Sequence, residues 1–117
     1  HIARLAPWVS LIGAPTGSDP ALHLLVALID FSGLDRTRAQ VMHALSAQGI
    51  GSQVHYVPVH RQPYYRQRYG LSDLPGADAF YSQCLSLPLF ASMSDEDPVR
   101  VVRALVDALG LKPEKDI

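Results

Sequence analysis

The chain has 117 residues and a mass of 12.8 kDa, of which 48% are hydrophobic and 18% charged. This length and composition suit one compact domain over residues 1–117 and exclude disordered and fibrous proteins. Eleven acidic residues against ten basic ones give a formal net charge of −1, so a general nucleic-acid binder is not expected. No apolar run reaches the roughly 18 residues of a membrane span, and the single cysteine fits a reducing compartment. We therefore expect a soluble, cytoplasmic protein without a membrane partner.

The first third of the chain predicts a loop followed by a strand. Residues 2–6 suit the last turn of a helix, whereas residues 7–20 contain too many prolines and glycines for a regular element, so residues 1–20 are interpreted as an irregular lead-in. Residues 22–31, LHLLVALIDF, are apolar at odd and even positions. Leucine and alanine would tolerate a helix there, but the short length and the following Ser32-Gly33 turn favour a strand.

The middle of the chain predicts a helix, a short strand and a tyrosine-rich turn. Thr37 and Gln40 have the spacing of a capping box, an apolar stripe follows, and Gly49 suits the residue after the helix. Residues 51–58 alternate like a short strand that ends at Pro58. Residues 60–69 are interpreted as a loop entering a short helix.

The last third predicts two helices separated by an extended piece. Residues 76–86 suit a helix with Ala79, Phe80 and Cys84 inward, and residues 87–90 are extended, with Pro88 as an edge or a terminator. The final helix starts after Ser94 or, equally well, after Asp97, and Gly110 ends it; its apolar stripe is Val102, Leu105, Val106 and Leu109.

These elements predict an α/β fold of the α+β type, with a small, mostly antiparallel sheet and helices on one face. Two amphipathic helices cover only one face of a small sheet, yet the strand at 22–31 is apolar on both faces. The hypothesis is that its other face meets a partner domain.

Several chemical readings can be weighed from residue types. His55 and His60 lie near one turn, but the stretch between them lacks the cysteine or carboxylate that would complete a zinc site, so no metal residue is predicted. Cys84 is interpreted as a buried small hydrophobe rather than a nucleophile.

The stretch 61–69 carries three arginines and three tyrosines without an acid. It suits a solvated helix face with packed tyrosines, a surface for single-stranded nucleic acid, or a site for the phosphates of a small anionic ligand. Neither GxGxxG nor GxxxxGK accompanies it. Both lysines, Lys112 and Lys115, lie in the polar tail, where nothing would lower a pKa enough for Schiff-base chemistry.

The stretch 49–65, GIGSQVHYVPVHRQPYY, resembles the C-terminal domain of the nucleotide-sugar aminotransferases. That pyridoxal-phosphate family of fold type I includes enzymes named for spore coat polysaccharide biosynthesis. LSLPLF at 85–90 and MSDE at 93–96 follow in the family's order, so the resemblance covers about residues 22–110. Residues 53–70 are most similar to the branch that aminates a UDP-linked 4-keto-6-deoxy-N-acetylhexosamine on the way to pseudaminic acid.

The resemblance implies that the intact enzyme moves an amino group, usually from glutamate, to a C4 ketone. It also implies that an N-terminal domain supplies pyridoxal phosphate, the Schiff-base lysine and an aspartate, and that two subunits form a homodimer. Because this chain has none of those groups, we expect an inactive fragment without catalytic residues or a cofactor of its own.

The resemblance further implies which residues form one wall of the sugar-nucleotide cleft. These are Gln53, Val54, His55 and Tyr56, followed by His60 and Arg61 on the next loop. A core position is the alternative for Val54, because strand side chains alternate between faces. For the whole chain, the alternatives are a stand-alone module that binds a small ligand and a single-strand nucleic-acid binder.

Overall fold

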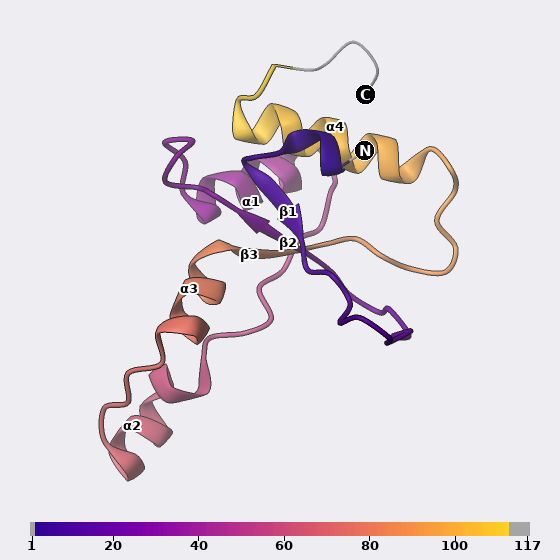
Figure 1. Ribbon diagram of the computed structural model, residues 1–117. Helices are drawn as coiled ribbons and strands as arrows, with labels where there is room; N and C mark the ends of the chain where they lie inside the picture. Colours follow the sequence, from indigo (N-terminus) through magenta and orange to yellow (C-terminus); the bar gives the residue numbers. More distant parts are fainter. Residues whose placement is uncertain (1, 113–117) are drawn as a thin grey trace.

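A three-stranded antiparallel sheet forms the centre of the computed structural model, which describes residues 2–112 (Figure 1). The strand order is β1 (Val9–Leu11), β2 (Leu25–Ile29) and β3 (Cys84–Leu87), so that β2 is the middle strand. In the register, Val9 faces Ile29 on one side and Leu25 faces Leu87 on the other. The prediction of a small antiparallel sheet is confirmed, and the strand expected at 22–31 is present in its central five residues.

Helix α1 (Arg38–Ala47) forms where the capping box predicts it. The Thr37 side chain accepts from the backbone N–H of Gln40 at 3.2 Å, and the Gln40 side chain accepts from the N–H of Thr37 at 2.8 Å. Each bond satisfies a donor that the first helical turn would otherwise leave unpaired. Gly49 follows the helix with φ +71°, a left-handed conformation that glycine adopts without a side-chain clash.

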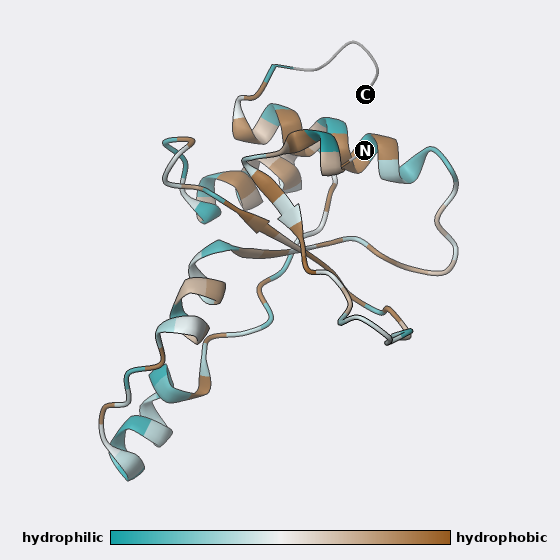
Figure 2. Ribbon diagram, in the orientation of Figure 1, coloured by the Kyte–Doolittle hydropathy of each residue, from teal (hydrophilic) through white to brown (hydrophobic). Residues whose placement is uncertain are grey.

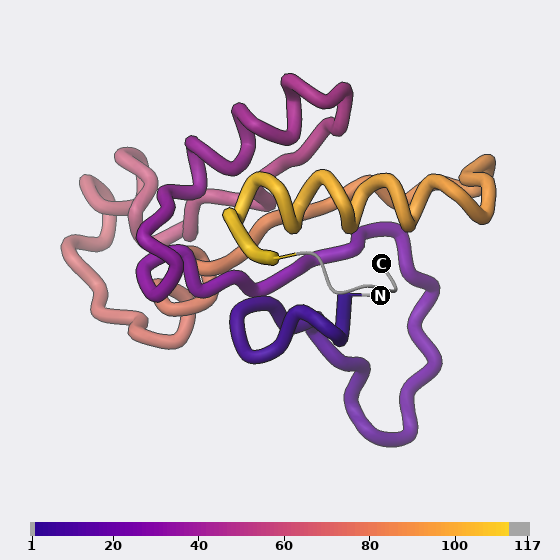
Figure 3. Tube along the Cα trace, turned by 90° about the horizontal axis from the view of Figure 1, so that it is seen from above, coloured from indigo at the N-terminus to yellow at the C-terminus, as the bar shows by residue number. Residues whose placement is uncertain are grey.

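Helix α4 (Asp97–Leu109) begins one residue before the later of the two predicted starts, with Pro98 in its first turn. All four residues of the predicted stripe are buried, and Gly110 caps the helix in the left-handed region with φ +71°. Helices α1 and α4 lie side by side on one face of the sheet, as the view from above shows (Figure 3). The expected helical layer on one face is therefore confirmed.

The apolar core lies between this helical layer and the sheet. Figure 2 shows the hydrophobic colours gathering on α4, α1 and the strands. The side chains with less than 2% exposure include Val9, Ile29, Val41, Leu45, Leu85, Leu105, Val106 and Leu109. By alternation, Val26 and Leu28 of β2 point to the opposite face, where they are half-buried. A partner on that face stays a prediction.

Residues 57–83 leave the body as a protruding arm (Figure 1). The arm holds the 3₁₀ turn η2 (Val59–Arg61) and the helices α2 (Pro63–Tyr69) and α3 (Pro75–Gln83), and none of these three elements has a buried residue. The Cα radius of gyration is 15.8 Å, compared with about 13 Å for a compact domain of this length. The arm accounts for the elongated shape.

The residues 7–20 are not wholly irregular, which corrects the prediction made from their composition. A 3₁₀ turn, η1 (Ile2–Leu5), precedes them, and β1 forms between Pro7 and Gly13. Composition alone misses this strand because its backbone partner, β2, lies more than ten residues further along the chain. The remaining residues, 12–24, form an open loop without a helix or strand.

Two predicted boundaries in the later chain are also wrong. The helix expected at 76–86 ends at Gln83, because Cys84–Leu87 pairs with β2 as a strand. Ala79 and Phe80 are exposed rather than inward, since α3 projects from the body. The strand expected at 51–58 is reduced to one antiparallel bridge, between Gln53 and Ser86. β3 ends at Leu87, directly before Pro88, so only Leu87 of the extended piece expected at 87–90 lies in a strand.

Within residues 2–112, no helix combines the length and the apolar character that crossing a bilayer requires.

The packing of α4 on the sheet predicts a large cost for truncating Leu105, which is fully buried. We expect Leu105→Ala to lower the free energy of unfolding by about 3 kcal/mol, through lost burial and a residual cavity. Leu71→Ala is the matched control, because Leu71 is 82% exposed, and its cost should stay below about 0.5 kcal/mol. Chemical denaturation measures both, and equal costs would contradict this account of the core.

Candidate functional site

The segment 53–56 lies along the free edge of β3. The backbone N–H of Gln53 donates to the carbonyl of Ser86 at 3.1 Å, and the N–H of Ser86 donates back to the carbonyl of Gln53 at 2.8 Å. These two bonds attach the segment to the sheet as the beginning of a fourth strand. His55 and Tyr56 follow two and three residues later, directly before the arm begins at residue 57.

His55 is held by a side chain that the sequence did not single out. Its Nδ1 lies 2.8 Å from the hydroxyl oxygen of Ser86, which is only 5% exposed. The hydroxyl either donates to Nδ1 or accepts from it, depending on the tautomer, and Nε2 stays available for another partner. The Tyr56 ring packs edge-on against the imidazole at 4.8 Å and is 73% exposed. The pair thus combines an oriented imidazole with an accessible phenol.

The other two residues predicted for this wall have different surroundings. Val54 is half-buried and is not among the apolar residues of the main core within the described chain, so the core alternative for it is wrong. The side-chain oxygen of Gln53 accepts from the backbone N–H of Val54 at 3.2 Å. Gln53 therefore shapes the edge through its backbone bridge and steadies the next residue.

His60 and Arg61 form a second cluster, within the arm, around one carboxylate. Asp78 of α3 lies 3.0 Å from Nε2 of His60 and 2.6 Å from Nε of Arg61, both measured to the same oxygen, Oδ1. The side chain of His60 is 9% exposed and that of Arg61 is 48% exposed. This cluster joins η2 to α3, so that two separate segments of the arm hold one another.

A third contact anchors the arm to the body. The guanidinium of Arg38, from α1, lies 4.5 Å from the centre of the Tyr81 ring, and its Nη1 donates to the carbonyl oxygens of Tyr81 and Cys84. Arg61 lies 5.7 Å from the same ring. Tyr81 is therefore contacted by one cation from the body and one from the arm.

The structure thus divides the six predicted residues into two groups. Gln53, Val54, His55 and Tyr56 lie at the sheet edge beside Ser86, whereas His60 and Arg61 bind Asp78 inside the arm. Sequence reasoning missed the two partners, Ser86 and Asp78. The sequence did hold a signal for Asp78. Residues 60–72 contain three arginines and no acid, so an ion-pair partner has to come from elsewhere, and Asp73 and Asp78 are the next acids along the chain. No comparable signal marked Ser86.

Cys84 is buried, as predicted, at 2% exposure. Burial raises the pKa of its thiol above the ordinary value, although the positive charge of Arg38 opposes this rise. A protonated, enclosed thiol is a poor nucleophile. Among residues 2–112, no three histidine, cysteine or acidic side chains gather closely enough to hold a metal ion.

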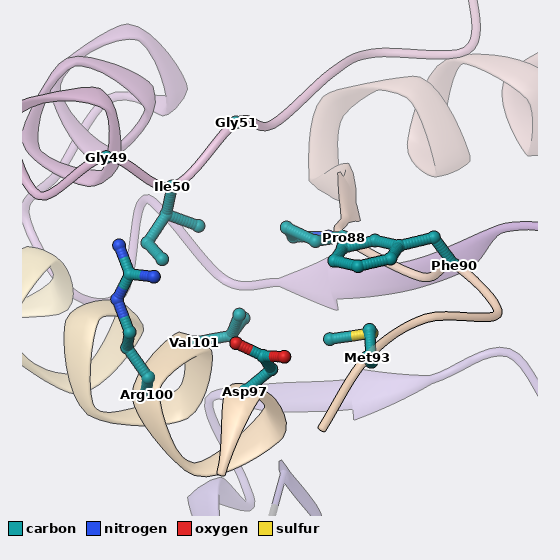
Figure 4. Close-up of a pocket in the computed structure, with 9 residues that line it drawn as sticks. All are labelled: Gly49, Ile50, Gly51, Pro88, Phe90, Met93, Asp97, Arg100 and Val101. Carbon is teal, nitrogen blue, oxygen red and sulfur yellow. The ribbon is translucent and has the colours of Figure 1, made fainter. Parts of the chain in front are cut away.

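A separate cavity of about 350 Å³ opens between the end of α1, the β3–α4 loop and α4 (Figure 4). Its two charged side chains are already engaged. Arg100 donates to the carbonyl of Gln48 at 3.1 Å, and Asp97 accepts from the backbone N–H and the hydroxyl of Ser94. The N–H bond from Ser94 lowers the pKa of Asp97. The remaining lining is mostly apolar or glycine, and includes Ile50, Phe90 and Met93. None of the predicted site residues borders this cavity.

The family model of the DegT/DnrJ/EryC1/StrS aminotransferases matches residues 4–106. The chain belongs to this family. It is 41% identical over 90 residues to the spore coat polysaccharide biosynthesis protein SpsC of Bacillus subtilis, an alignment that covers 74% of this chain and 23% of SpsC. The chain therefore spans about a quarter of the length of this curated relative, and the family resemblance of residues 49–65 and 85–96 is confirmed.

Solved structures share the fold. Helicobacter pylori PseC, an aminotransferase involved in the biosynthesis of pseudoaminic acid, superposes with a TM-score of 0.81 at 22% identity over 93% of this chain and 29% of PseC. The PLP-form of Spr1654, a putative sugar aminotransferase of Streptococcus pneumoniae, gives 0.79 at 22% identity over 91% of this chain and 27% of that one. These likenesses confirm the α/β fold.

The bond between His55 and Ser86 predicts a local effect of removing the hydroxyl. Ser86→Ala should lower the free energy of unfolding by about 1 kcal/mol and change the imidazole nitrogen shifts of His55 in an NMR spectrum. Ser82→Ala is the control, because the Ser82 hydroxyl donates to the Ala79 carbonyl in an exposed part of α3. Unchanged His55 signals in Ser86→Ala would contradict the assignment of Ser86 as the partner.

The raised pKa and burial of Cys84 predict a slow reaction with thiol reagents. At mildly alkaline pH the folded chain should react at least about tenfold more slowly than the chain in denaturant, because less thiolate is present and access is blocked. A colorimetric thiol assay under both conditions measures the two rates. Similar rates would mean that Cys84 is accessible in the native state.

Proposed function

We propose that this chain is the C-terminal small domain of a pyridoxal-phosphate-dependent nucleotide-sugar aminotransferase, which aminates a 4-keto sugar in surface polysaccharide or pseudaminic acid biosynthesis. The observation that carries the proposal is the 41% identity to SpsC together with the family match over residues 4–106. The name of the structural neighbour PseC supports the sugar class. Glutamate is the amino donor, and the parent enzyme is a homodimer.

The residues of this chain do not fit the cofactor's own site. A Schiff base requires a lysine amine in a sheltered setting. The described lysine, Lys112, is exposed after the end of α4, and Lys115 lies outside the described residues. The rest of the family fold, about three quarters of the length of SpsC, would supply the lysine and the cofactor pocket. No catalytic step is assigned to this chain.

The role of this chain is to form one wall of the sugar-nucleotide cleft. The imidazole of His55, oriented by Ser86 through Nδ1, would offer Nε2 to a sugar hydroxyl or a phosphate oxygen. The exposed ring of Tyr56 would pack against the hexose and offer its hydroxyl as a second donor. Oriented donors of this kind hold a substrate in one pose, which is what a positioning wall contributes to catalysis.

The test is a chimera in which residues 4–106 replace the matching quarter of Bacillus subtilis SpsC. We expect the chimera to bind pyridoxal phosphate and to form more than one equivalent of 2-oxoglutarate per cofactor from glutamate only when a UDP-linked 4-keto sugar is present. Replacing His55 with alanine should lower kcat/KM by about tenfold, the loss of one good hydrogen bond to substrate.

Thr16→Ala, in the open loop of residues 12–24, is the matched control and should leave the rate unchanged. A chimera that folds and binds the cofactor but aminates no UDP-linked keto sugar would contradict the proposed substrate class. A full rate in the His55→Ala chimera would instead contradict the role given to the sheet edge.

A further inference from the structure

The three arginines of the arm are alike in the sequence but differ in what they bind. Arg68 donates from Nε to the hydroxyl of Tyr69 at 3.1 Å and from Nη1 to the hydroxyl of Tyr64 at 3.5 Å. Arg61 forms an ion pair with Asp78 through Nε. The guanidinium of Arg66 has no hydrogen bond or ion pair within residues 2–112. The arm therefore holds one guanidinium whose donors are all available.

Arg66 lies beside two open hollows on the surface of the arm. One, of about 440 Å³, lies against Pro63 and Gly70; the other, of about 470 Å³, is lined by His60, Arg61, Arg66, Leu71, Ser72 and Asp78. The second hollow thus brings two arginines, a histidine and a serine hydroxyl to one concave surface. The arginines and the serine are hydrogen-bond donors, His60 directs its Nε2 to Asp78, and Asp78 is the one acid of the lining.

Asp78 orients this cluster without neutralising all of it. Its Oδ1 lies 2.6 Å from Nε of Arg61 in an ion pair, and the four Nη hydrogens of Arg61 have no hydrogen-bond partner among the described residues. Histidine is counted as neutral in the formal net charge of −1 for the whole chain. By the same count, the two arginines and Asp78 give the lining of the hollow a charge of +1. The hollow is therefore a local positive site on a nearly neutral protein.

We propose that this hollow binds the phosphate groups of a nucleotide diphosphate, with Arg66 and Arg61 as the principal donors. Guanidinium groups match the geometry of phosphate oxygens and bind them with two parallel hydrogen bonds. The Ser72 hydroxyl is a third donor. The identification of the nucleotide as part of a sugar substrate rests on the proposed function, whereas the phosphate site itself rests on the geometry of the arm.

The position of the hollow suits a ligand that also reaches the sheet edge. Tyr56 and Arg61 are five residues apart, so their Cα atoms are separated by at most about 17 Å. A nucleotide sugar carries its diphosphate between the sugar and the nucleoside. A sugar beside His55 and Tyr56 would thus place its diphosphate toward the arm, where Arg61 and Arg66 lie.

A small ligand agrees better with the arm than a nucleic-acid strand does. Tight binding of a strand needs several unpaired cations in a row, whereas Arg66 is the one arginine of the arm without an ion pair or a side-chain hydrogen bond among the described residues. The tyrosines are also occupied with one another, since Tyr65 stacks on Tyr69 at 6.3 Å with an interplanar angle of 17°.

The test is an NMR titration of the isotope-labelled 117-residue chain with UDP, inorganic pyrophosphate and uridine, which lacks phosphate. We expect saturable shifts of the Ser72 amide and the Arg66 Nε signal with UDP and pyrophosphate at millimolar ligand, and none with uridine. Arg66→Gln should weaken UDP binding about tenfold, the loss of one charged donor. Arg68→Gln, on the same helix, is the matched control and should leave the affinity unchanged.

Three results of the binding experiments would overturn the proposal. The first is that neither UDP nor pyrophosphate shifts the signals around the hollow. The second is that the wild-type chain and Arg66→Gln bind UDP with equal affinity. The third is that a single-stranded oligonucleotide binds the arm much more tightly than UDP does. Because this readout is direct binding, its failure is separate from failure of the aminotransferase assay of the chimera. The Arg66→Gln change can also be made in the chimera. If that variant is active and its KM for the sugar nucleotide equals that of the unchanged chimera, the phosphate site is rejected and the proposed function is retained.

Discussion

The antiparallel pairing of β3 with the central strand β2 is the constraint on which the candidate site depends. This pairing places Leu85 and Leu87 in the core and turns Cys84 and Ser86 to the opposite face. The hydroxyl of Ser86 contacts the imidazole of His55 on that face, while its backbone exchanges two hydrogen bonds with Gln53 at the free edge of β3. A shift of the register by one residue would turn Ser86 into the core and remove the partner of His55.

The arm is held by polar contacts rather than by a core of its own. Helices α2 and α3 bury no residue, and helices of seven and nine residues are marginal without tertiary support. Asp78 supplies that support inside the arm by joining η2 to α3, while Arg38 joins the end of α3 to α1. Charged groups therefore determine where the arm lies, and the same groups leave donors free on its surface.

Two kinds of chemistry meet where the arm leaves the sheet. The edge segment presents an oriented imidazole and an exposed phenol, which suit neutral polar groups such as sugar hydroxyls. The arm presents guanidinium groups, which suit phosphate oxygens. A domain that forms one wall of a cleft for a sugar nucleotide needs both kinds of donor along one path. The described lysine, Lys112, is far along the chain from both and exposed.

The sequence alone determined the elements whose causes are local. The capping box at Thr37, the stripe of α4 and the glycines after both helices predict those helices correctly, because the relevant contacts lie within a few residues. The GIGSQVHY and LSLPLF stretches likewise identified the family, as the match over residues 4–106 confirms.

Only the tertiary structure decided the features that depend on distant partners. β1 exists because β2 supplies its hydrogen bonds, and residues 84–86 are a strand rather than helix for the same reason. Ser86 beside His55, 31 residues apart, and Asp78 between His60 and Arg61 follow from strand pairing and from the path of the arm. No local pattern encodes such contacts, because they join residues that are far apart in the sequence and depend on the tertiary path of the chain between them.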